Sequence, residues 1–362
     1  MANEVFERVH HPREAGKGSK KSFACKSWRP KPFIWLFLVS LFPVPNISWS
    51  APPSVRMAQP STSLGWLSVY AARANGYFND EGIALELIIV QGGADIAAII
   101  SGSVDFDATS TGGLLRAFSG GTELLGIYSI LGKCIYDLVI RKDTAKRLGI
   151  TPAMPVQERL KRIKGTVIGA GSGIGVIPYQ VAYFLVKEAG LEPGKDVTIL
   201  AVGGGDSALV ALRTGHIDIM SYPPPFPQIA IKNGDAISLV ANTRGEYPPL
   251  NSFQTSVLLV RPEYAKKNHD TVRRVVGAMV RGSRWVAEND AKEVAKVVAK
   301  FFKNAPSDVL LSTVEMIKPA VIPDGRMALD GLKGVEEVYR ANGVVKKPVP
   351  WDRLVTNEFL PR

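Results

Sequence analysis

Short runs of β-branched and apolar residues alternate with helix-length amphipathic segments from residue 51 to about residue 260. This alternation is typical of βαβ units built on a largely parallel sheet. Between two of the runs, Ala182, Leu185 and Ala189 fall on one face of a helix predicted over 178–189. Ten strands are predicted, over residues 55–59, 84–90, 104–108, 124–129, 136–141, 166–170, 197–202, 217–220, 236–241 and 255–260.

Beyond residue 270 the spacing of apolar residues becomes wholly helical. Long helices are predicted over 271–289, 291–303 and 332–341, and no strand is expected after Val260. The pattern therefore predicts an α/β fold followed by a helical C-terminal region.

An internal repeat links the two series of strands. Residues 98–106 read AIISGSVDF and residues 211–219 read ALRTGHIDI, so that Ala, Gly, a branched residue and Asp match at a constant offset. Each copy follows a glycine-rich turn, QGG at 91–93 and GGGD at 203–206, and each turn follows a predicted strand. Glycines let backbone N–H groups at a helix start face a ligand. The repeat predicts two lobes whose ligand-facing turns oppose each other across a cleft.

Two similar strands enclose the second copy of the repeat. They read DLVIR at 137–141 and SVLLVR at 256–261, and we expect them to cross between the lobes. Two crossings permit a hinge, because a few residues at the strand ends can absorb the rotation that closes one lobe on the other.

The first 50 residues have the layout of a secretory signal peptide. A basic run over 17–31 precedes a segment, 33–42, that is apolar at nine of ten positions. Small residues at Ser48 and Ser50 predict cleavage near Ser50, and hence export to the periplasm. A segment of ten residues spans about half of a bilayer core, which disfavours a membrane anchor.

Charge and cysteine content argue against a nucleic-acid-binding protein and against a metal-binding one. Net charge is +11, but the first 50 residues hold eight Lys/Arg against three Asp/Glu, which leaves 36 against 30 in the rest. That +6 is spread without an aromatic-interleaved basic stripe, so no nucleic-acid partner is expected. Cys25 and Cys134 lack zinc-ligand spacing, no metal or cofactor site is expected, and Cys134 is interpreted as a buried apolar residue.

Catalytic motifs are not found in the sequence after residue 50. His216 and His269 lie outside any HExxH frame, and Ser172 lacks the flanking glycines of a nucleophile elbow. The glycine run 169–175 misses the dinucleotide-binding spacing because Ile174 occupies the third glycine's place. The expected activity is therefore binding, with no catalytic residue assigned.

Small hydroxyl residues follow several predicted strands. They occur at 60–63, 109–112 and 171–173, where helices are expected to begin. Hydroxyl and N–H groups there suit a carboxylate, sulfonate or phosphate group, although each cluster alone is equally typical of a helix N-cap. Trp66 and Tyr222 lie near these ends and could stack on a planar ligand, with core packing the default for Trp66.

The chain after residue 50 resembles the periplasmic substrate-binding proteins of ABC importers, in the nitrate, sulfonate and taurine group that includes binders of thiamine-pyrimidine precursors. The block ARANGYFNDEGIALE at 72–86 is similar to that family's AxxxGYFxxEG motif. Shorter matches follow in order at 102–106, 164–169, 195–198 and 215–218.

The resemblance implies a two-lobed periplasmic binding protein fold of the doubly crossed type. Residues 1–50 are then the leader, 51–142 with 256–362 form lobe 1, and 143–255 form lobe 2. It also implies a monomer that delivers a small solute to an ABC permease and ATPase. Together with the two aromatic residues, the implied ligand contacts are Ser61, Thr62, Trp66, Gly92, Gly93, Ser110, Thr111, Ser172, Gly173, Gly204, Asp206 and Tyr222.

The chemistry of the solute stays open at this point. No arginine can be assigned to the cleft, since Arg73 is expected on the wrong side of its helix and Arg244 in a loop. Asp206 would repel a dianion, which favours a neutral, zwitterionic or heteroaromatic solute. Two alternatives remain, an enzyme on the same scaffold acting on a pyrimidine or aromatic acid, and a ligand-sensing module read by a receptor.

Overall fold

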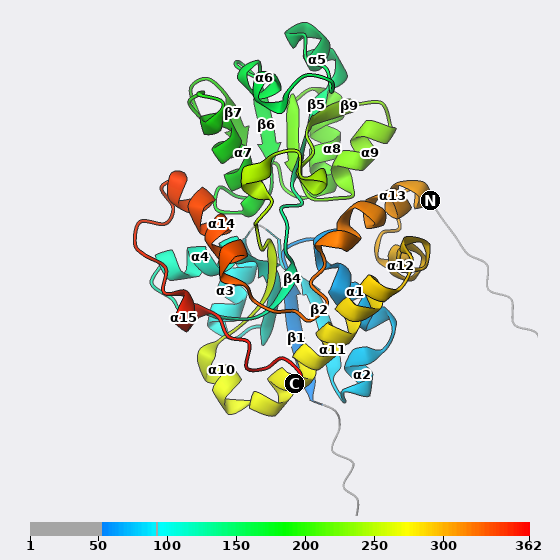
Figure 1. Cartoon of the computed structure of the whole chain (residues 1–362), viewed down its shortest axis with the longest axis vertical. Coiled ribbons are helices and arrows are strands. Elements are labelled where there is room, and N and C mark those ends of the chain that lie inside the picture. The colour runs from blue at the N-terminus through cyan, green and yellow to red at the C-terminus, as the bar shows by residue number, and fades with distance from the viewer. Residues whose placement is uncertain (1–52, 92) are drawn as a thin grey trace, which may run out of the picture. The chain divides into compact units, whose positions relative to one another are not determined.

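The computed structural model describes residues 53–91 and 93–362 (Figure 1). Each of the ten predicted strands is present, with boundaries that differ from the prediction by no more than two residues. The strands are β1 (Ser54–Gln59), β2 (Ala84–Ile89), β3 (Phe106–Ser110), β4 (Leu125–Leu131), β5 (Asp137–Arg141), β6 (Val167–Ala170), β7 (Thr198–Leu200), β8 (Ile219–Tyr222), β9 (Ala236–Val240) and β10 (Ser256–Val260).

The strands form two five-stranded mixed sheets of matching topology. The first sheet has the order β2-β1-β3-β10-β4 and the second the order β7-β6-β8-β5-β9. Three strands run parallel at one side of each sheet, and the fourth strand in each order, β10 or β5, is antiparallel to both its neighbours. In Figure 1 the second sheet lies above the first. Each sheet with its helices is called a lobe below.

Helices flank both sheets and make up the C-terminal region, as predicted. Beyond β10 the described residues form helices and their connections, among them a helix at 307–317 that the sequence pattern did not predict. The helices are α1 (Leu67–Ala74), α2 (Tyr77–Asp80), α3 (Ala94–Ser101), α4 (Thr111–Ser119), α5 (Lys142–Leu148), α6 (Val156–Lys161), α7 (Ile177–Glu188), α8 (Gly205–Thr214), α9 (Phe226–Lys232), α10 (Pro262–Lys267), α11 (His269–Glu288), α12 (Ala291–Val298), α13 (Ser307–Ile317), α14 (Leu329–Ala341) and α15 (Trp351–Leu354).

The chain passes twice between the sheets within the region 53–362. Residues 132–136 lead from β4 to β5, and residues 241–255 lead from β9 back to β10. The antiparallel strand of each sheet is thus the one that enters directly from the other sheet. β5 pairs with β8 and β9, so sheet membership places 137–141 in the second lobe, whereas the expected boundary after residue 142 assigned this strand to the first.

The repeated segments occupy matching places in the two lobes. Gly102 ends α3 and Gly215 ends α8, both with φ near +80°. Each of these glycines packs against an arginine at the end of a crossing strand. Arg261, directly after β10, packs against Gly102, and Arg141, the last residue of β5, packs against Gly215. Arg261 donates to the carbonyls of Ile99 and Val104 at 2.5 and 2.8 Å. The repeat therefore includes the crossing strands as well as the helix and its turn.

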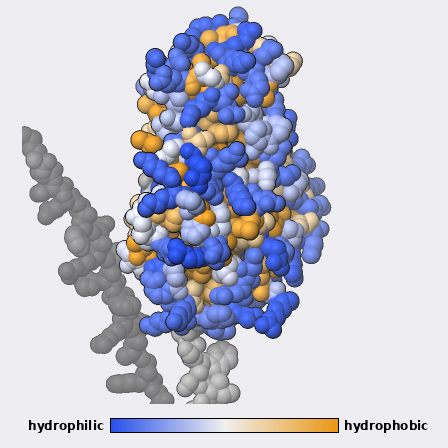
Figure 2. All heavy atoms as spheres, turned by 60° about the vertical axis from the view of Figure 1, so that its left-hand side comes forward, coloured by the Kyte–Doolittle hydropathy of each residue, from blue (hydrophilic) through white to orange (hydrophobic). Residues whose placement is uncertain are grey.

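A large apolar core runs through the first lobe and one face of the second sheet, and a smaller cluster covers the other face of that sheet. Successive side chains of a strand point to opposite faces of its sheet. In β5, Leu138 and Ile140 accordingly pack in the large core, whereas Val139 packs in the small cluster. On the face drawn in Figure 2, hydrophobic residues lie in small groups among hydrophilic ones. No helix within the described residues is long and apolar enough to span a membrane. The predicted leader, 1–50, lies outside the described residues.

Candidate ligand-binding site

A pocket with about 740 Å³ of space between its atoms, mouth included, lies where the carboxyl ends of the parallel strands of both lobes meet. The first lobe contributes residues after β1 and at the end of β3, among them Ser61 and Ser110. The second lobe contributes residues after β6 and β7 and at the end of β8, among them Ser172 and Tyr222. Sites outside the carboxyl ends of strands are usual for α/β sheets.

Half of the twelve residues expected to contact a ligand line this pocket. They are Ser61, Trp66, Ser110, Ser172, Gly204 and Tyr222. The lining does not include Thr62, Gly93, Thr111, Gly173 or Asp206, and Gly92 lies outside the described residues.

Local contacts explain why several of these residues lie elsewhere. Thr111 is fully buried, and its hydroxyl donates to the Gln254 carbonyl, which ties the start of α4 to the segment before β10. Thr62 and Asp206 line a separate groove beside Lys300 and Lys303. Asp206 would therefore repel an anion in that groove, outside the pocket.

Three helices begin at the pocket wall. Ser110, Gly204 and Val176 line the pocket and directly precede α4, α8 and α7, and none of them caps its helix through a side-chain hydrogen bond. The first N–H groups of a helix have no partner within the helix and carry a partial positive charge. The arrangement brings such groups from both lobes to one space. Ser63, also at the wall, accepts instead from Gly65 N at 3.0 Å and is an N-cap.

Arg116 is the functional candidate that the sequence analysis missed. It lies on α4, lines the pocket, and is the cation among the lining residues. Its Nε has no hydrogen-bond partner, and no ion pair to it occurs within the described residues. A Cβ placed on Gly175 would lie 2.5 Å from its Cδ, and one on Gly93 would lie 3.0 Å from its Nη1. Glycines in both lobes thus leave the space that Arg116 occupies.

The two arginines considered from the sequence lie away from the pocket. Arg73 is exposed on α1, with its guanidinium 5.9 Å from the ring centre of Phe301, and Arg244 lines a groove beside α9 and α13. Arg116 follows Gly112 by four residues, so the two share a face of α4. Gly112 packs so closely on Tyr339 that a Cβ would overlap its hydroxyl. In the sequence, this close packing was indicated by the adjacent glycines Gly112 and Gly113 at the start of the helix.

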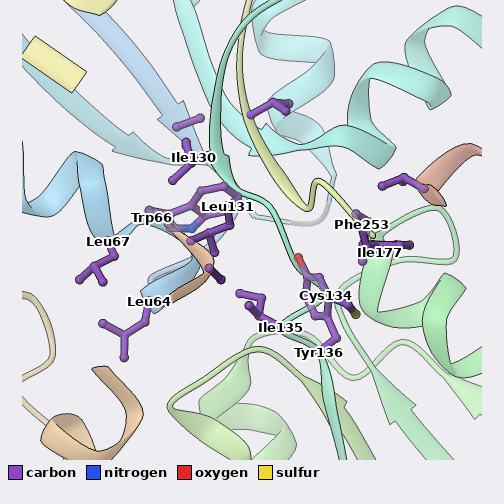
Figure 3. Close-up of a cluster of buried hydrophobic side chains, with 14 of the residues drawn as sticks. Leu64, Trp66, Leu67, Ile130, Leu131, Cys134, Ile135, Tyr136, Ile177 and Phe253 are labelled. Atoms are coloured by element: carbon purple, nitrogen blue, oxygen red, sulfur yellow. The ribbon is translucent and has the colours of Figure 1, made fainter. Parts of the chain in front are cut away.

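Aromatic residues at the wall are held by hydrogen bonds. Trp66 is 3% exposed and its Nε1 donates to Ser61 O at 2.9 Å, so its ring is packed mainly in the core. The Tyr222 hydroxyl lies 2.8 Å from Gly203 O and 3.2 Å from Gly171 O, and it links two turns of the second lobe. Burial raises the pKa of Tyr222 well above its usual value. Figure 3 shows Ile135 and Tyr136 on the segment that leads from β4 to β5, and Trp66 near Leu131 at the end of β4.

The lobes also touch outside the pocket. Tyr339 of α14 donates to Gly175 O at 3.0 Å, and Asn342 donates to the Gln180 carbonyl at 2.9 Å. On α13, Asp308 pairs with Lys232 of α9. Because Gly175 contacts both Tyr339 and Arg116, the C-terminal helix α14 helps to shape the pocket.

Comparisons with known proteins give a consistent result. YtlA of Bacillus subtilis (strain 168) is 20% identical over 321 residues, which cover 84% of this chain and 88% of that protein. A structure from Bordetella bronchiseptica RB50 matches with a TM-score of 0.72 and 22% identity, covering 86% and 96% of the two chains. The alkanesulfonate-binding protein SsuA from Xanthomonas axonopodis pv. citri, bound to MOPS, matches with a TM-score of 0.66 and 17% identity, covering 85% and 99%.

These structural likenesses identify the two-lobed fold of periplasmic binding proteins. The family model described as NMT1/THI5 like matches residues 65–293, which include the strands of the second lobe, four of the five strands of the first lobe and most of the pocket wall. On that match, the chain belongs to the NMT1/THI5-like family.

Proposed function

We propose that this protein is an extracytoplasmic solute-binding protein of an ABC importer that binds a small anionic solute. The observation that carries the proposal is the position of Arg116 in a pocket where helices from both lobes begin. A guanidinium and helix N-termini together are suited to a carboxylate, sulfonate or nitrate group. The sulfonate ligand of the Xanthomonas protein, MOPS, belongs to this class of anions.

Hydroxyl groups from both lobes complete the proposed contacts. Ser61 and Ser110 lie on the first lobe's side of the pocket and Ser172 on the second lobe's side, next to the N–H groups around Gly204. A ligand held between these groups would bond to both lobes at once. Binding would then favour the closed arrangement of the lobes, since a ligand shifts an equilibrium by its difference in affinity for the two states.

The crossing segments 132–136 and 241–255 provide the connection about which the lobes would rotate. In the proposed mechanism the closed, loaded form docks on a permease, which passes the solute across the membrane at the expense of an associated ATPase. The protein acts as a monomer after export to the periplasm and cleavage near Ser50. N-terminal sequencing of the secreted protein tests that last step, because an intact N-terminus would contradict it.

An aromatic or heteroaromatic part of the solute has a place in the pocket as well. The aromatic residues Trp66, Tyr136 and Phe226 line it, together with Val176 and Ile177. An aromatic sulfonate or carboxylate could therefore bind with its anionic group towards Arg116.

The experiment is a binding panel on the purified mature protein. Thermal shift and isothermal titration calorimetry would compare alkanesulfonates, taurine, nitrate, aromatic carboxylates and neutral pyrimidines, and small-angle scattering would follow compaction. We expect one anionic class to bind with compaction. Binding restricted to neutral pyrimidines would contradict the anion assignment. Chemical turnover of the bound solute would favour an enzyme on this scaffold instead.

The buried thiol of Cys134 is not arranged as a nucleophile for such an enzyme. Cys134 is 1% exposed, and burial raises the pKa of its thiol to about 12. A nucleophilic cysteine needs a lowered pKa and access to the substrate. The geometry therefore supports binding better than cysteine-based catalysis.

A further inference from the structure

Two aspartates lie together behind the pocket wall, next to Arg116. Asp107, the second residue of β3, has no exposed surface, and neither of its carboxylate oxygens has a hydrogen-bond partner with an N–H or O–H group. Asp95, in the first turn of α3, is 1% exposed and lines the pocket. Its Oδ2 accepts from the Thr109 hydroxyl at 2.7 Å, while Oδ1 has no partner within the described residues. Asp107 and Thr109 are two residues apart on β3 and so lie on the same face of the strand, and the Thr109 hydroxyl holds Asp95 beside them.

The charged groups that face Asp107 are Asp95 from α3 and Arg116 from α4. Its neighbours in register on β1 and β10, Ala58 and Leu259, carry no charge. Two neighbouring carboxylates away from water cannot both be ionised at low cost. Burial, followed by the charge of Asp95, raises the pKa of Asp107 well above its usual value, and Arg116 opposes the change only in part.

We propose that Asp107 keeps its proton at neutral pH and donates it to Asp95, so that the pair carries one negative charge. This single charge balances Arg116 without cancelling its attraction for an anion in the pocket. Loss of the proton would place a second negative charge behind Arg116 and would weaken anion binding. Asp107 is thus a positioning residue that acts through Asp95 and Arg116, and it makes the affinity for an anion depend on pH.

This inference rests on the proposed anion site at Arg116, and its test separates the two. The probes are ethanesulfonate and nitrate, because neither anion changes its own charge between about pH 5 and pH 9. With the wild-type protein we expect the dissociation constant to rise about tenfold across the pH range above neutrality in which Asp107 loses its proton, the factor that corresponds to one pKa unit of interaction. The substitution Asp107→Asn keeps a hydrogen-bond donor towards Asp95 and carries no charge, so its dissociation constant should stay level over the same range.

One further variant sharpens the comparison. Asp206→Asn, at the groove outside the pocket, is the matched control and should keep the wild-type pH profile. If neither probe binds at pH 6, the anion site itself is wrong and this inference fails with it. If a probe binds with the same pH profile in the wild type and in Asp107→Asn, only the proton-sharing pair is overturned.

A measurement without ligand provides an independent readout. A protonated carboxyl has a C=O stretching band distinct from the bands of a carboxylate. The infrared difference spectrum of the wild type minus Asp107→Asn at pH 7.5 should contain that band. A difference spectrum with carboxylate bands alone would show that Asp107 is ionised and would overturn the proposal, whatever the binding data.

Discussion

Asp105 and Asp218 perform the same task in the two lobes. Oδ2 of Asp105 accepts from the backbone N–H of Arg56 in β1 at 2.9 Å, and Oδ2 of Asp218 accepts from the N–H of Val167 in β6 at 3.0 Å. In return, each aspartate donates its own N–H to the carbonyl of that residue at 2.8 Å. The repeated aspartate therefore closes the start of the sheet, at the end opposite the pocket.

Replacing either aspartate with alanine should destabilise the protein without changing the pocket. Each substitution leaves a backbone N–H without its partner, and we expect a loss of about 1–3 kcal/mol in the free energy of unfolding. Because the residues lie in different sheets, the two losses should add. Urea unfolding of the single and double variants measures both effects.

The matched controls are Asp105→Asn and Asp218→Asn, which keep one acceptor oxygen at the same place. They should lose less stability than the alanine variants. Equal losses for asparagine and alanine would show that the charge, rather than the backbone hydrogen bond, is what matters.

Arg116→Gln should reduce affinity for the anionic solute by about 10- to 100-fold, because hydrogen bonds to a charged group contribute about 1.5–3 kcal/mol. Isothermal titration calorimetry measures the affinity. Asp206→Asn serves as a charge-changing control outside the pocket. Wild-type affinity in Arg116→Gln would rule out the proposed anion contact.

Tyr339→Phe should weaken closure of the lobes. The substitution removes the hydrogen bond to Gly175 O, whose net contribution is about 0.5–1.5 kcal/mol, while the ring keeps its packing. We expect affinity to fall by about two- to tenfold, together with less compaction in small-angle scattering. A loss of stability with unchanged affinity and compaction would assign Tyr339 a packing role alone.

Asp137 gives the folded protein a specific pH dependence. It is buried at the start of β5, and burial raises its pKa from 3.8 to about 6 despite hydrogen bonds from Thr243 and Gln228. A raised pKa means that the folded state binds this proton more tightly than the unfolded chain does. The resulting stabilisation is fully present below about pH 4 and is lost as pH rises through about 6, a change of about 3 kcal/mol.

Asp137→Asn stays neutral at every pH and should not show this change. The free energy of unfolding of the variant relative to the wild type should therefore increase by about 3 kcal/mol between pH 4 and pH 7, as measured by urea unfolding. Asp143→Asn is the control, because Arg141 lowers the pKa of the exposed Asp143 and the trend there should be small and opposite. A constant difference between Asp137→Asn and the wild type would refute the prediction.

Much of the fold could be predicted from the sequence because it depends on local pattern. Strands buried on both faces read as short apolar runs, so all ten were located, and the similar crossing strands identified the two passages between the lobes. The helix α13 was missed, although Val309, Leu310 and Thr313 mark its buried face. The repeat was recognised, but its aspartates could not be assigned to the far end of the sheets without knowing which backbone groups they meet.

The sequence by itself determined the order of strands and helices and where the chain turns at the pocket, because burial and turn chemistry act between near neighbours. Only the tertiary structure decided which charges reach the pocket. The direction of a side chain depends on the rotation of its helix and on partners far away in the chain. Gly112 meets Tyr339 and Gly175 meets Arg116 across more than 50 positions of sequence, and those contacts bring Arg116 to the pocket while Asp206 lies outside its lining.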